Sequence, residues 1–299
     1  MKIGILSFYP SRKRDKEALM LKKAAIALGH KAVVFRHTNA QLVFDQNHPR
    51  VLYRGKKLPS YDVIIPRASK VNNNDLESAI IKQFELMGVP VFNSFSSIVR
   101  AKNKLRTLQV LDHLDISIPR TVVVRKMEYI NEAIDKVGGV PVIVKTPYGS
   151  LGSGVAIVES KRSLYSALDI IWGSSDLILI QEYIKASKGK DIRVIVVNDK
   201  VVAAMERRAR KGDFRSNIGQ GGSGRMVDLS EEEKEISIQA TKALKLQYAG
   251  VDLIKDKDHT MVMEVNCNPG LKGISEVSPV DIPTEIIKGA VEFASQSKD

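Results

Sequence analysis

Short apolar runs alternate with amphipathic helical segments through the first 92 residues. The predicted strands cover residues 2–8, 31–36, 62–66 and 89–92, and the predicted helices cover residues 15–28 and 75–87. Gly29 and Gly88 follow the two helices, where a chain often leaves the helical conformation. Alternation of this kind predicts a mainly parallel sheet with helices on its faces, and a small hairpin is expected around Gly55.

The rest of the chain continues with mixed strand and helix signals. After a helical linker at residues 96–114 we expect a second βαβ-like region up to residue 182. Its strands are predicted at residues 120–124, 141–145, 154–159 and 177–182, and its helices at 128–137 and 163–172. The last third predicts strands at 191–197 and 201–207, a loop at 211–224, a helix at 230–246, a hairpin of 250–254 with 260–266, and a helix at 283–294. The fold class is therefore α/β, with α+β character in the C-terminal part.

The cysteine count and the missing motifs exclude several classes of protein. Cys267 is the single cysteine, so no disulfide forms within the chain, as is usual in a reducing cytosol. The sequence has no HExxH, CxxC or GxSxG motif, which removes support for zinc hydrolysis and for a nucleophile elbow. The start lacks the features of a signal peptide, and no apolar run has the length of a membrane span. We expect a cytoplasmic protein without a membrane partner.

The positive charge is concentrated in the first third of the chain. Residues 1–106 contain 20 Lys and Arg against 7 Asp and Glu, whereas the whole chain contains 46 against 34. The net charge of +12 thus comes entirely from this third. A basic surface attracts acidic partners, although an exposed basic surface often serves solubility alone. An acidic peptide or a nucleic acid is the partner that this asymmetry favours.

Two carboxylates and an amide are predicted to meet in the hairpin near the C-terminus. Side chains alternate between the faces of a strand, so Glu264 and Asn266 share one face and Met261, Met263 and Val265 share the other, which we expect in the core. A turn near residue 258 would place Asp252 opposite Glu264. Three oxygen ligands suit Mg²⁺, which keeps waters and shares substrate phosphates. The alternative is a pair of surface carboxylates at a sheet edge.

A lysine followed by a glycine-rich loop is the second candidate site. Lys145 ends an apolar strand, and the loop after it contains Gly149, Ser150, Gly152 and Ser153. Glycines let backbone N–H groups approach phosphate oxygens, but an ordinary hairpin turn has the same composition. The loop does not match GxxxxGK[ST], and a strand is expected after it, which argues against a P-loop. The GxGxxG at residues 219–224 lacks the strand-to-helix context of a dinucleotide site and is interpreted as a substrate loop.

Two further segments carry weaker signals. Arg207 ends a predicted strand and Arg215 follows in a basic loop, where arginines can bind phosphate or simply face solvent. The apolar strand at 177–182 ends in Gln181 and Glu182 and is followed by Tyr183. Such a strand end can present backbone groups to an adenine, or it can be an ordinary core strand.

The order of these motifs resembles that of the ATP-grasp ligases. The stretches QEYIKASKGKDIR, ERRARKGDFRSN, AGVDL and MEVNCNPGL, with MKIGILS and YRGKKLPSYDVIIPR near the start, are similar to the ribosomal protein S6 modification (RimK) group of glutamate ligases. The resemblance extends over nearly the whole chain. It implies a Rossmann-like N-terminal domain (residues 1–97), a linker helix and central domain with a glycine-rich lid (98–183), and a C-terminal domain with the metal site (184–299).

The resemblance also implies a role for each matching residue. The phosphates would be contacted by Lys104 and Lys145, under the loop of Gly149, Ser150, Gly152 and Ser153. Adenine would be held by Gln181, Glu182 and Tyr183, and the ribose by Asp191. The phosphate and acyl side would be lined by Arg215, Ser216 and Asn217, and charge during catalysis would be neutralised by Arg193, Arg207 and Arg215. Mg²⁺ or Mn²⁺, with two ions expected, would be bound by Asp252, Glu264 and Asn266. The loops at 148–154 and 218–222 vary within the family, so we expect them to select the acceptor.

The implied reaction joins a carboxylate to an amine through an acyl phosphate, with ATP as the phosphoryl donor. The preferred substrates are L-glutamate and an acidic protein or peptide C-terminus, with ribosomal protein S6 as the first candidate. A small carboxylate or an amino-group carrier protein is the alternative acceptor. An RNA- or ribosome-binding module with a vestigial nucleotide site is the alternative of another class, although the ligase reading requires no direct contact with nucleic acid. A homo-oligomer is possible.

Overall fold

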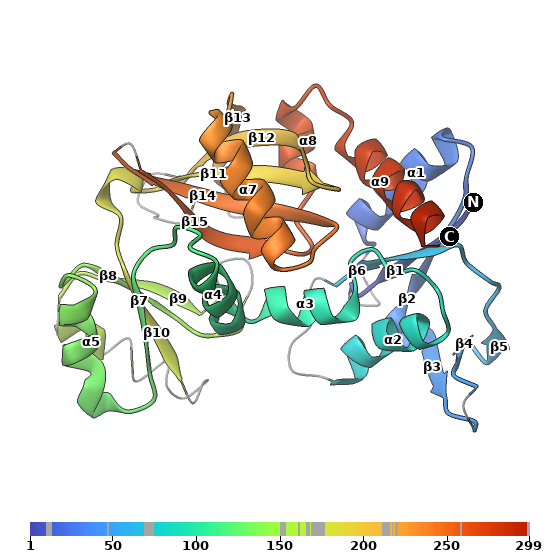
Figure 1. Cartoon of the computed structure of the whole chain (residues 1–299), viewed down its shortest axis with the longest axis horizontal. Coiled ribbons are helices and arrows are strands. Elements are labelled where there is room, and N and C mark those ends of the chain that lie inside the picture. The colour runs from blue at the N-terminus through green and yellow to red at the C-terminus, as the bar shows by residue number, and fades with distance from the viewer. Residues whose placement is uncertain are drawn as a thin grey trace.

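The computed structural model describes most of the chain, and Figure 1 shows the arrangement of its elements. The described residues are 1–9, 14–46, 48–68, 75–149, 154–160, 162–165, 168, 177–210, 216, 218, 221–257 and 259–297. Within these ranges the elements form an elongated molecule. The N-terminal sheet lies at one end, a four-stranded sheet at the other, and the largest sheet beside both.

The N-terminal unit contains the parallel sheet that the sequence predicts. Its strand order is β2-β1-β6, and its elements are β1 (Lys2–Ser7), α1 (Lys16–Ala27), β2 (Lys31–Arg36), β6 (Val63–Arg67) and α2 (Asp75–Leu86). The carboxylate of Asp15 caps α1 by accepting a hydrogen bond from the backbone of Ala18. The strand expected at 89–92 is reduced to a single bridge between Val91 and Ile64.

A small antiparallel sheet extends from this unit. It comprises β3 (Ala40–Val43), β4 (Arg50–Tyr53) and β5 (Lys56–Lys57). The last two strands are the hairpin predicted around Gly55, which has φ +75°. The sequence analysis does not include β3, whose pairing partner is seven or more residues further along the chain.

The linker consists of two helices rather than one. α3 (Phe95–Lys102) ends at Asn103, and α4 (Lys104–His113) begins directly after it. Asn103 has an extended backbone, with φ −104° and ψ 108°, and its side-chain oxygen accepts a hydrogen bond from the backbone of Arg106. Asparagine favours such a cap over a helix interior, which explains the break that hydrophobic periodicity alone does not predict.

The central sheet is antiparallel, so the prediction of a βαβ-like region is wrong in this respect. The strand order is β7-β10-β8-β9, formed by β7 (Thr121–Val124), β8 (Val142–Lys145), β9 (Val155–Val158) and β10 (Ile178–Glu182), with α5 (Ile130–Lys136) packed on it. The loop that joins β8 to β9 is too short for the crossover that parallel strands require. Part of the helix predicted at 163–172 is present at 162–165, and most of the rest lies outside the described residues.

The C-terminal sheet has five antiparallel strands in the order β13-β12-β11-β14-β15. These are β11 (Lys190–Val197), β12 (Lys200–Arg208), β13 (Ser223–Met226), β14 (Tyr248–Asp256) and β15 (His259–Asn266). α7 (Glu231–Ala243) covers one face, starting from a capping box between Ser230 and Glu233. β13 occupies part of the segment predicted as a loop, and α8 (Lys272–Val277) is an addition to the prediction. The last helix, α9 (Ile282–Gln296), contacts α1 of the N-terminal unit (Figure 1).

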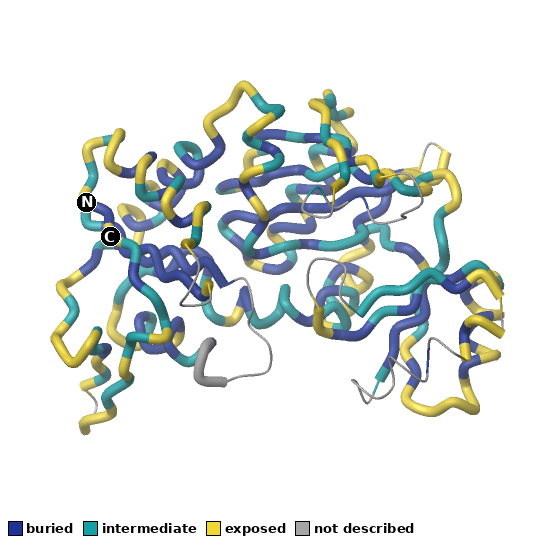
Figure 2. The backbone as a smooth tube through the Cα atoms, turned by 180° about the vertical axis from the view of Figure 1, so that it is seen from behind, coloured by how far each residue is buried: buried dark blue, intermediate teal, exposed yellow. Residues whose placement is uncertain are grey.

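Buried side chains form three clusters, and two of them join the N-terminal and C-terminal units. Ile5 and Ile65 of the N-terminal sheet lie in one cluster with Ile195 of β11 and Ile286 of α9. The third cluster lies entirely within residues 124–180. Figure 2 shows these interiors as dark blue segments within each unit. None of the described helices is both long enough and apolar enough to cross a bilayer.

Candidate active site

A small pocket lies where the central sheet approaches the C-terminal sheet and α4. It is lined by Ala101, Lys104, Thr107, Leu108, Leu111, Lys145, Leu179, Gln181, Met263, Glu264 and Val265. These residues come from α3, α4, β8, β10 and β15, so the pocket is assembled from segments distant in sequence. Its apolar side chains come from α3, α4, β10 and β15, and its charged groups are Lys104, Lys145 and Glu264. An apolar pocket with a few convergent polar groups is the usual form of a small-molecule site.

Lys145 is the central sheet's contribution to this pocket. Its Nζ donates a 2.6 Å hydrogen bond to the side-chain oxygen of Gln181 on the neighbouring strand β10. Burial lowers the pKa of Lys145 to about 8, even though the Glu264 carboxylate favours the charged form; the nearby Lys104 lowers the pKa further. Because burial removes part of the hydration of this ammonium group, an anionic ligand would stabilise its charged form.

The start of the glycine-rich loop is held by the start of α4. The Lys104 backbone donates to the carbonyl of Pro147 at 2.9 Å, and its Nζ donates to the carbonyl of Gly149 at 3.2 Å. The Asn103 side chain donates to the Tyr148 hydroxyl at 2.9 Å. A strand, β9, follows the loop, which confirms that a P-loop arrangement is absent here. The predicted loop residues Ser150, Gly152 and Ser153 lie outside the described residues.

Alternating acidic and basic side chains form a buried network on one face of the C-terminal sheet. Arg207 donates to both carboxylate oxygens of Asp191, at 2.6 and 2.7 Å, and lies 2.9 Å from Asp252. Arg193 donates to both oxygens of Asp252, at 2.5 and 2.6 Å. The Ser216 hydroxyl donates to Asp191 at 2.5 Å. Burial raises the pKa of Asp252, but the two arginines outweigh it and hold that pKa below its ordinary value.

The strand register brings the three predicted metal ligands together. Asp252 of β14 lies opposite Glu264 of β15, as predicted, and the Asn266 side-chain nitrogen lies 3.4 Å from an Asp252 oxygen. The register shifts just after Asp252, so that Leu253 pairs with Val262 and Met263 becomes the extra residue of a bulge. Met263 was expected in the core, and the bulge instead places it in the pocket beside Glu264.

The donor set fits a hard divalent cation such as Mg²⁺. Within the described part of the chain, the Glu264 carboxylate makes no hydrogen bond or ion pair, although it is half-buried in a pocket that contains lysines. Asp252 shares its oxygens with two arginines, so it would have to share one of them with a metal. No group of three or more His, Cys, Asp or Glu suited to a metal occurs among the described residues. The amide oxygen of Asn266 is therefore needed as the third ligand.

The residues predicted to hold adenine have mixed surroundings. Gln181 lines the pocket and is buried between Lys145 and Thr121. The Glu182 carboxylate accepts hydrogen bonds from the Arg120 backbone at 2.7 Å and from the Arg120 guanidinium at 2.9 and 3.0 Å, so its side chain already has a partner. Tyr183 is half-buried beside it. Arg215 and Asn217, predicted on the acyl side, lie outside the described residues.

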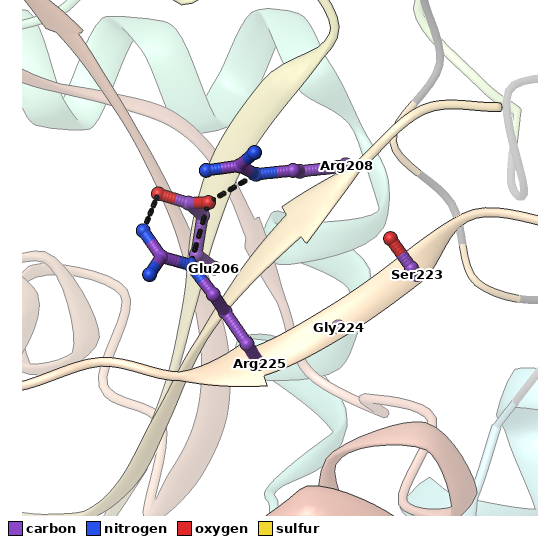
Figure 3. Close-up of a pocket in the computed structure, with 5 residues that line it drawn as sticks. All are labelled: Glu206, Arg208, Ser223, Gly224 and Arg225. Atoms are coloured by element: carbon purple, nitrogen blue, oxygen red, sulfur yellow. Dashed lines mark hydrogen bonds and ion pairs between the residues drawn. The ribbon is translucent and has the colours of Figure 1, made fainter. Parts of the chain in front are cut away.

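A second hollow lies at the edge of the C-terminal sheet and does not belong to this site. Glu206, Arg208, Ser223, Gly224 and Arg225 line it (Figure 3). Arg225 and Arg208 donate to the Glu206 carboxylate and lower its pKa to about 2. Strand alternation places these side chains on the sheet face opposite to the acidic and basic network. This hollow is therefore separate from the candidate site at the boundary of the central sheet.

The sequence analysis missed the apolar lining of that pocket. Thr107, Leu108 and Leu111 come from one side of α4, at the three- and four-residue spacing of a helix face. That spacing indicates a buried helix face, but it does not distinguish a pocket wall from a protein core. Met263 could not be found from sequence because the bulge that exposes it depends on strand pairing.

Comparison with known proteins identifies the family of this chain. Residues 1–98 match the RimK pre-ATP-grasp domain and residues 101–289 match the RimK-like ATP-grasp domain. A probable alpha-L-glutamate ligase of Coxiella burnetii is 40% identical over 96% of this chain and 94% of its own. A second protein of that name, from Vibrio vulnificus, is 38% identical over 94% and 92%.

Solved structures share the fold at lower identity. The ATP-grasp ligase PsnB in complex with a minimal precursor superposes with a TM-score of 0.75 at 20% identity, over 97% of this chain and 98% of its own. The D-alanine–D-alanine ligase of Bacillus anthracis gives a TM-score of 0.74 at 21% identity, over 100% and 99%. The chain belongs to the RimK family of ATP-grasp ligases, enzymes that use ATP and Mg²⁺ to join a carboxylate to an amine.

Proposed function

We propose that the protein adds L-glutamate to the C-terminal carboxylate of an acidic protein or peptide, with ribosomal protein S6 as the first candidate. The observation that carries the proposal is the pocket at the boundary of the central sheet. It places Lys104 and Lys145 opposite Glu264, whose carboxylate has no ion-pair partner in the described residues. Relatives named probable alpha-L-glutamate ligase support glutamate as the amine, and structural neighbours solved with precursor peptides support a peptide acceptor.

ATP would lie in this pocket between the two sheets. The adenine would rest against the apolar side of α4 and the end of β10, near Gln181 and Tyr183. The ammonium groups of Lys104 and Lys145 would contact the phosphates, and the loop that begins at Gly149 would cover them. Because burial has lowered the pKa of Lys145, a phosphate there would restore its full charge.

Asp252, Glu264 and Asn266 would hold Mg²⁺, or Mn²⁺ in its place, and we expect two ions. When bound, the metal supplies positive charge that stabilises the phosphates during transfer. Arg193 and Arg207 fix the orientation of Asp252 through bonds of 2.5 to 2.9 Å. We expect these arginines also to neutralise charge on the reacting groups.

The proposed reaction has two steps. An oxygen of the acceptor carboxylate attacks the γ-phosphorus of ATP, and the bond from this phosphorus to the oxygen it shares with the β-phosphate breaks. The products of this step are ADP and an acyl phosphate. The amine of glutamate then attacks the acyl carbon, inorganic phosphate leaves, and the amine loses a proton to solvent. No protein nucleophile is required, which agrees with the burial of Cys267 and the raised pKa of its thiol.

The charge distribution supports an acidic acceptor. Residues 1–106 carry 20 basic and 7 acidic side chains, and this unit adjoins the sheet that carries the site. An acidic peptide would be drawn toward this unit, and the attraction would weaken as salt rises.

Mass spectrometry of the reaction products tests the proposal. The enzyme is incubated with Mg-ATP, each amino acid in turn, and either S6 or a short acidic peptide. We expect a ladder of glutamate masses on the acceptor that requires both ATP and glutamate. The Glu264→Gln variant, prepared and assayed in parallel, serves as the control for a contaminating ligase.

Three results would contradict parts of the proposal. ADP release that requires glutamate together with a small carboxylate, and no extension of any peptide, would move the acceptor to the alternative class. Extension of the peptide with another amino acid, and not with glutamate, would show that glutamate is not the amine substrate. Binding of RNA without any amino-acid-dependent ADP release would remove the ligase activity itself.

A further inference from the structure

The loop that follows the candidate metal ligands is held by the N-terminal unit. Arg67, the last residue of β6, is 2% exposed, and both terminal nitrogens of its guanidinium donate to the carbonyl of Pro269, at 3.3 and 3.4 Å. The same guanidinium forms an ion pair with Glu17 of α1. Pro269 lies three residues after Asn266, so a side chain from the first unit reaches the immediate surroundings of the site.

Glu17 holds the same loop through its other oxygen. One carboxylate oxygen is paired with Arg67, and the second accepts hydrogen bonds from the backbone of Leu271 at 2.6 Å and of Lys272 at 3.3 Å. Arg67 and Glu17 thus bind one carbonyl and two amides of a four-residue segment. We call this arrangement the Arg67–Glu17 clamp.

Packing around Gly250 connects the clamped loop to the candidate site. A Cβ atom added to Gly250 would lie 2.7 Å from the Cβ of Pro269 and 3.1 Å from the Cδ of Arg193, so the proline and the arginine stem meet over the glycine. The side chain of Asn266 lies 3.4 Å from the carbonyl of Gly250. Gly250 thus lies beside Pro269, Arg193 and Asn266, and we expect a shift of Pro269 to reach both other side chains through it.

Asn93 provides a second connection between the same two units. Its side chain donates to the carbonyls of Tyr248 and Cys267, at 2.8 and 3.1 Å, and accepts from the backbone of Gln247 and Tyr248, at 2.6 and 3.1 Å. This connection fixes the first residues of β14 and the residue after Asn266. The carbonyl of Pro269 and the amides of Leu271 and Lys272 are bound by the clamp instead.

We propose that Arg67 and Glu17 are positioning residues of the ligase reaction, which hold the 269–272 loop so that Asn266 and Arg193 are correctly placed for the metal. The proposal rests on the assignment of Asp252, Glu264 and Asn266 as metal ligands. A buried ion pair often contributes little net stability, because desolvation offsets the attraction between the charges. A pair that instead sets the geometry around metal ligands affects metal affinity, as groups that orient ligands usually do.

The test measures Mn²⁺ binding to the full-length protein in the presence of ADP by electron paramagnetic resonance, with thermal unfolding measured in parallel. The variants are Arg67→Met and Glu17→Gln. The matched control is Glu233→Gln, which disrupts the pair between Glu233 (3% side-chain exposure) and Lys255 at 2.8 Å, outside the loop. We expect about tenfold weaker Mn²⁺ binding in both clamp variants and none of this loss in the control.

Two different results would overturn the positioning role of the clamp. If both clamp variants bind Mn²⁺ within about twofold of the wild type and lose only thermal stability, as the control does, the positioning role is wrong. If the wild type binds no Mn²⁺ with ADP, the assignment of the metal ligands is wrong, and the clamp then has no positioning role. The two failures are distinguishable, because in the first one the wild type still binds Mn²⁺. Should Arg67→Met not fold, the isosteric Glu17→Gln substitution carries the test, because it keeps the shape of the side chain and removes its charge.

Discussion

The two boundaries inside this molecule are built differently. Between the N-terminal and C-terminal units, apolar side chains from both sides share continuous clusters, and α9 lies against α1 (Figure 1). The central sheet, in contrast, has a core of its own within residues 124–180. Its described links to the rest include the bond from Val262 to the Ser117 carbonyl at 2.8 Å and the contacts of Lys104 with the glycine-rich loop.

This difference separates a fixed boundary from one that can open. Burial of apolar surface ties the first two units together, since separating them would expose that surface to water. No buried cluster of this kind joins the central sheet to the other units within the described residues, and its boundary contains the pocket, so a ligand can enter there at lower cost. Nucleotide binding is therefore expected to affect the boundary of the central sheet and to leave the boundary between the other two units unchanged.

The largest expected effect separates the two carboxylates of the site. Glu264 faces the pocket without an ion-pair partner in the described residues, so Glu264→Gln should lower the rate of ADP release by about 10²–10³-fold or more with little change in stability. Asp252→Asn should lose activity and also about 3–5 kcal/mol of stability, because Arg193 loses its charged partner and Arg207 keeps only Asp191. Steady-state assays and urea unfolding measure the two quantities. Equal stability losses in both variants would contradict the difference in their surroundings.

Core truncations on the two sides of the comparison should differ next. Ile286→Ala on α9 removes a side chain from the cluster shared by the N-terminal and C-terminal units and should cost about 2–5 kcal/mol, lowering the stability of both units together. Ile180→Ala should cost a similar amount but affect only the central sheet. Residue-resolved hydrogen exchange under native conditions distinguishes the patterns. Loss of protection in all three units from Ile180→Ala would mean that the central sheet is not independent.

The pH dependence of nucleotide binding should reveal Lys145. Its pKa is lowered from the ordinary 10.5 to about 8 by burial, so the free enzyme loses this proton above pH 8 and ATP must bring it back. ATP affinity should therefore fall by up to about tenfold per pH unit above 8, with uptake of about half a proton at pH 8. Calorimetry in buffers of different ionisation enthalpy measures this uptake.

The same lowered pKa has the opposite consequence for unliganded stability. Between pH 8 and 10.5 the unfolded chain binds the Lys145 proton that the folded chain has lost, so the contribution of this residue to stability rises with pH in that window. In Lys145→Met both pH effects should be absent. Proton uptake that persists in this variant would assign the titration to another group.

The smallest effect concerns the joint between α3 and α4. Asn103 caps α4 and donates to Tyr148 across the boundary of the central sheet. Asn103→Ala should cost about 1 kcal/mol in urea unfolding through loss of the cap. Asn103→Ser, which can cap the helix but does not reach as far, serves as the control. Comparable ATP affinity in the two variants and the wild type would show that the bond to Tyr148 does not contribute to the pocket.

Local sequence signals predicted much of this architecture. The alternating strands and helices of the first 92 residues indicate the parallel sheet, and strand alternation places Glu264 and Asn266 on one face of β15. Both follow from short-range periodicity, which each strand and helix carries in its own side chains. The position of the turn predicts that Asp252 lies opposite Glu264, and in the structure this pairing also depends on the bulge at Met263. Of the metal site, the strand register is confirmed, while the metal-binding role of its residues stays a prediction.

Other features depend on pairing between distant segments. The antiparallel central sheet, the bulge at Met263 and the edge strand β13 arise from tertiary contacts that no single segment determines. The Arg67–Glu17 clamp joins residues more than 200 positions apart. Arg67 ends an apolar strand and could have been noticed as a buried charge, but its partner could not be identified from sequence.

Hydrogen exchange of the wild-type enzyme with and without Mg-ADP tests the contrast between the two boundaries most directly. Nucleotide should slow exchange in β8, β10, α4 and β15, which line the pocket, and leave β1, β6 and the 268–272 loop unchanged. That result would place the nucleotide at the boundary of the central sheet and show the boundary between the N-terminal and C-terminal units as fixed. Protection confined to the β12–β13 edge, or equal changes at both boundaries, would contradict the account.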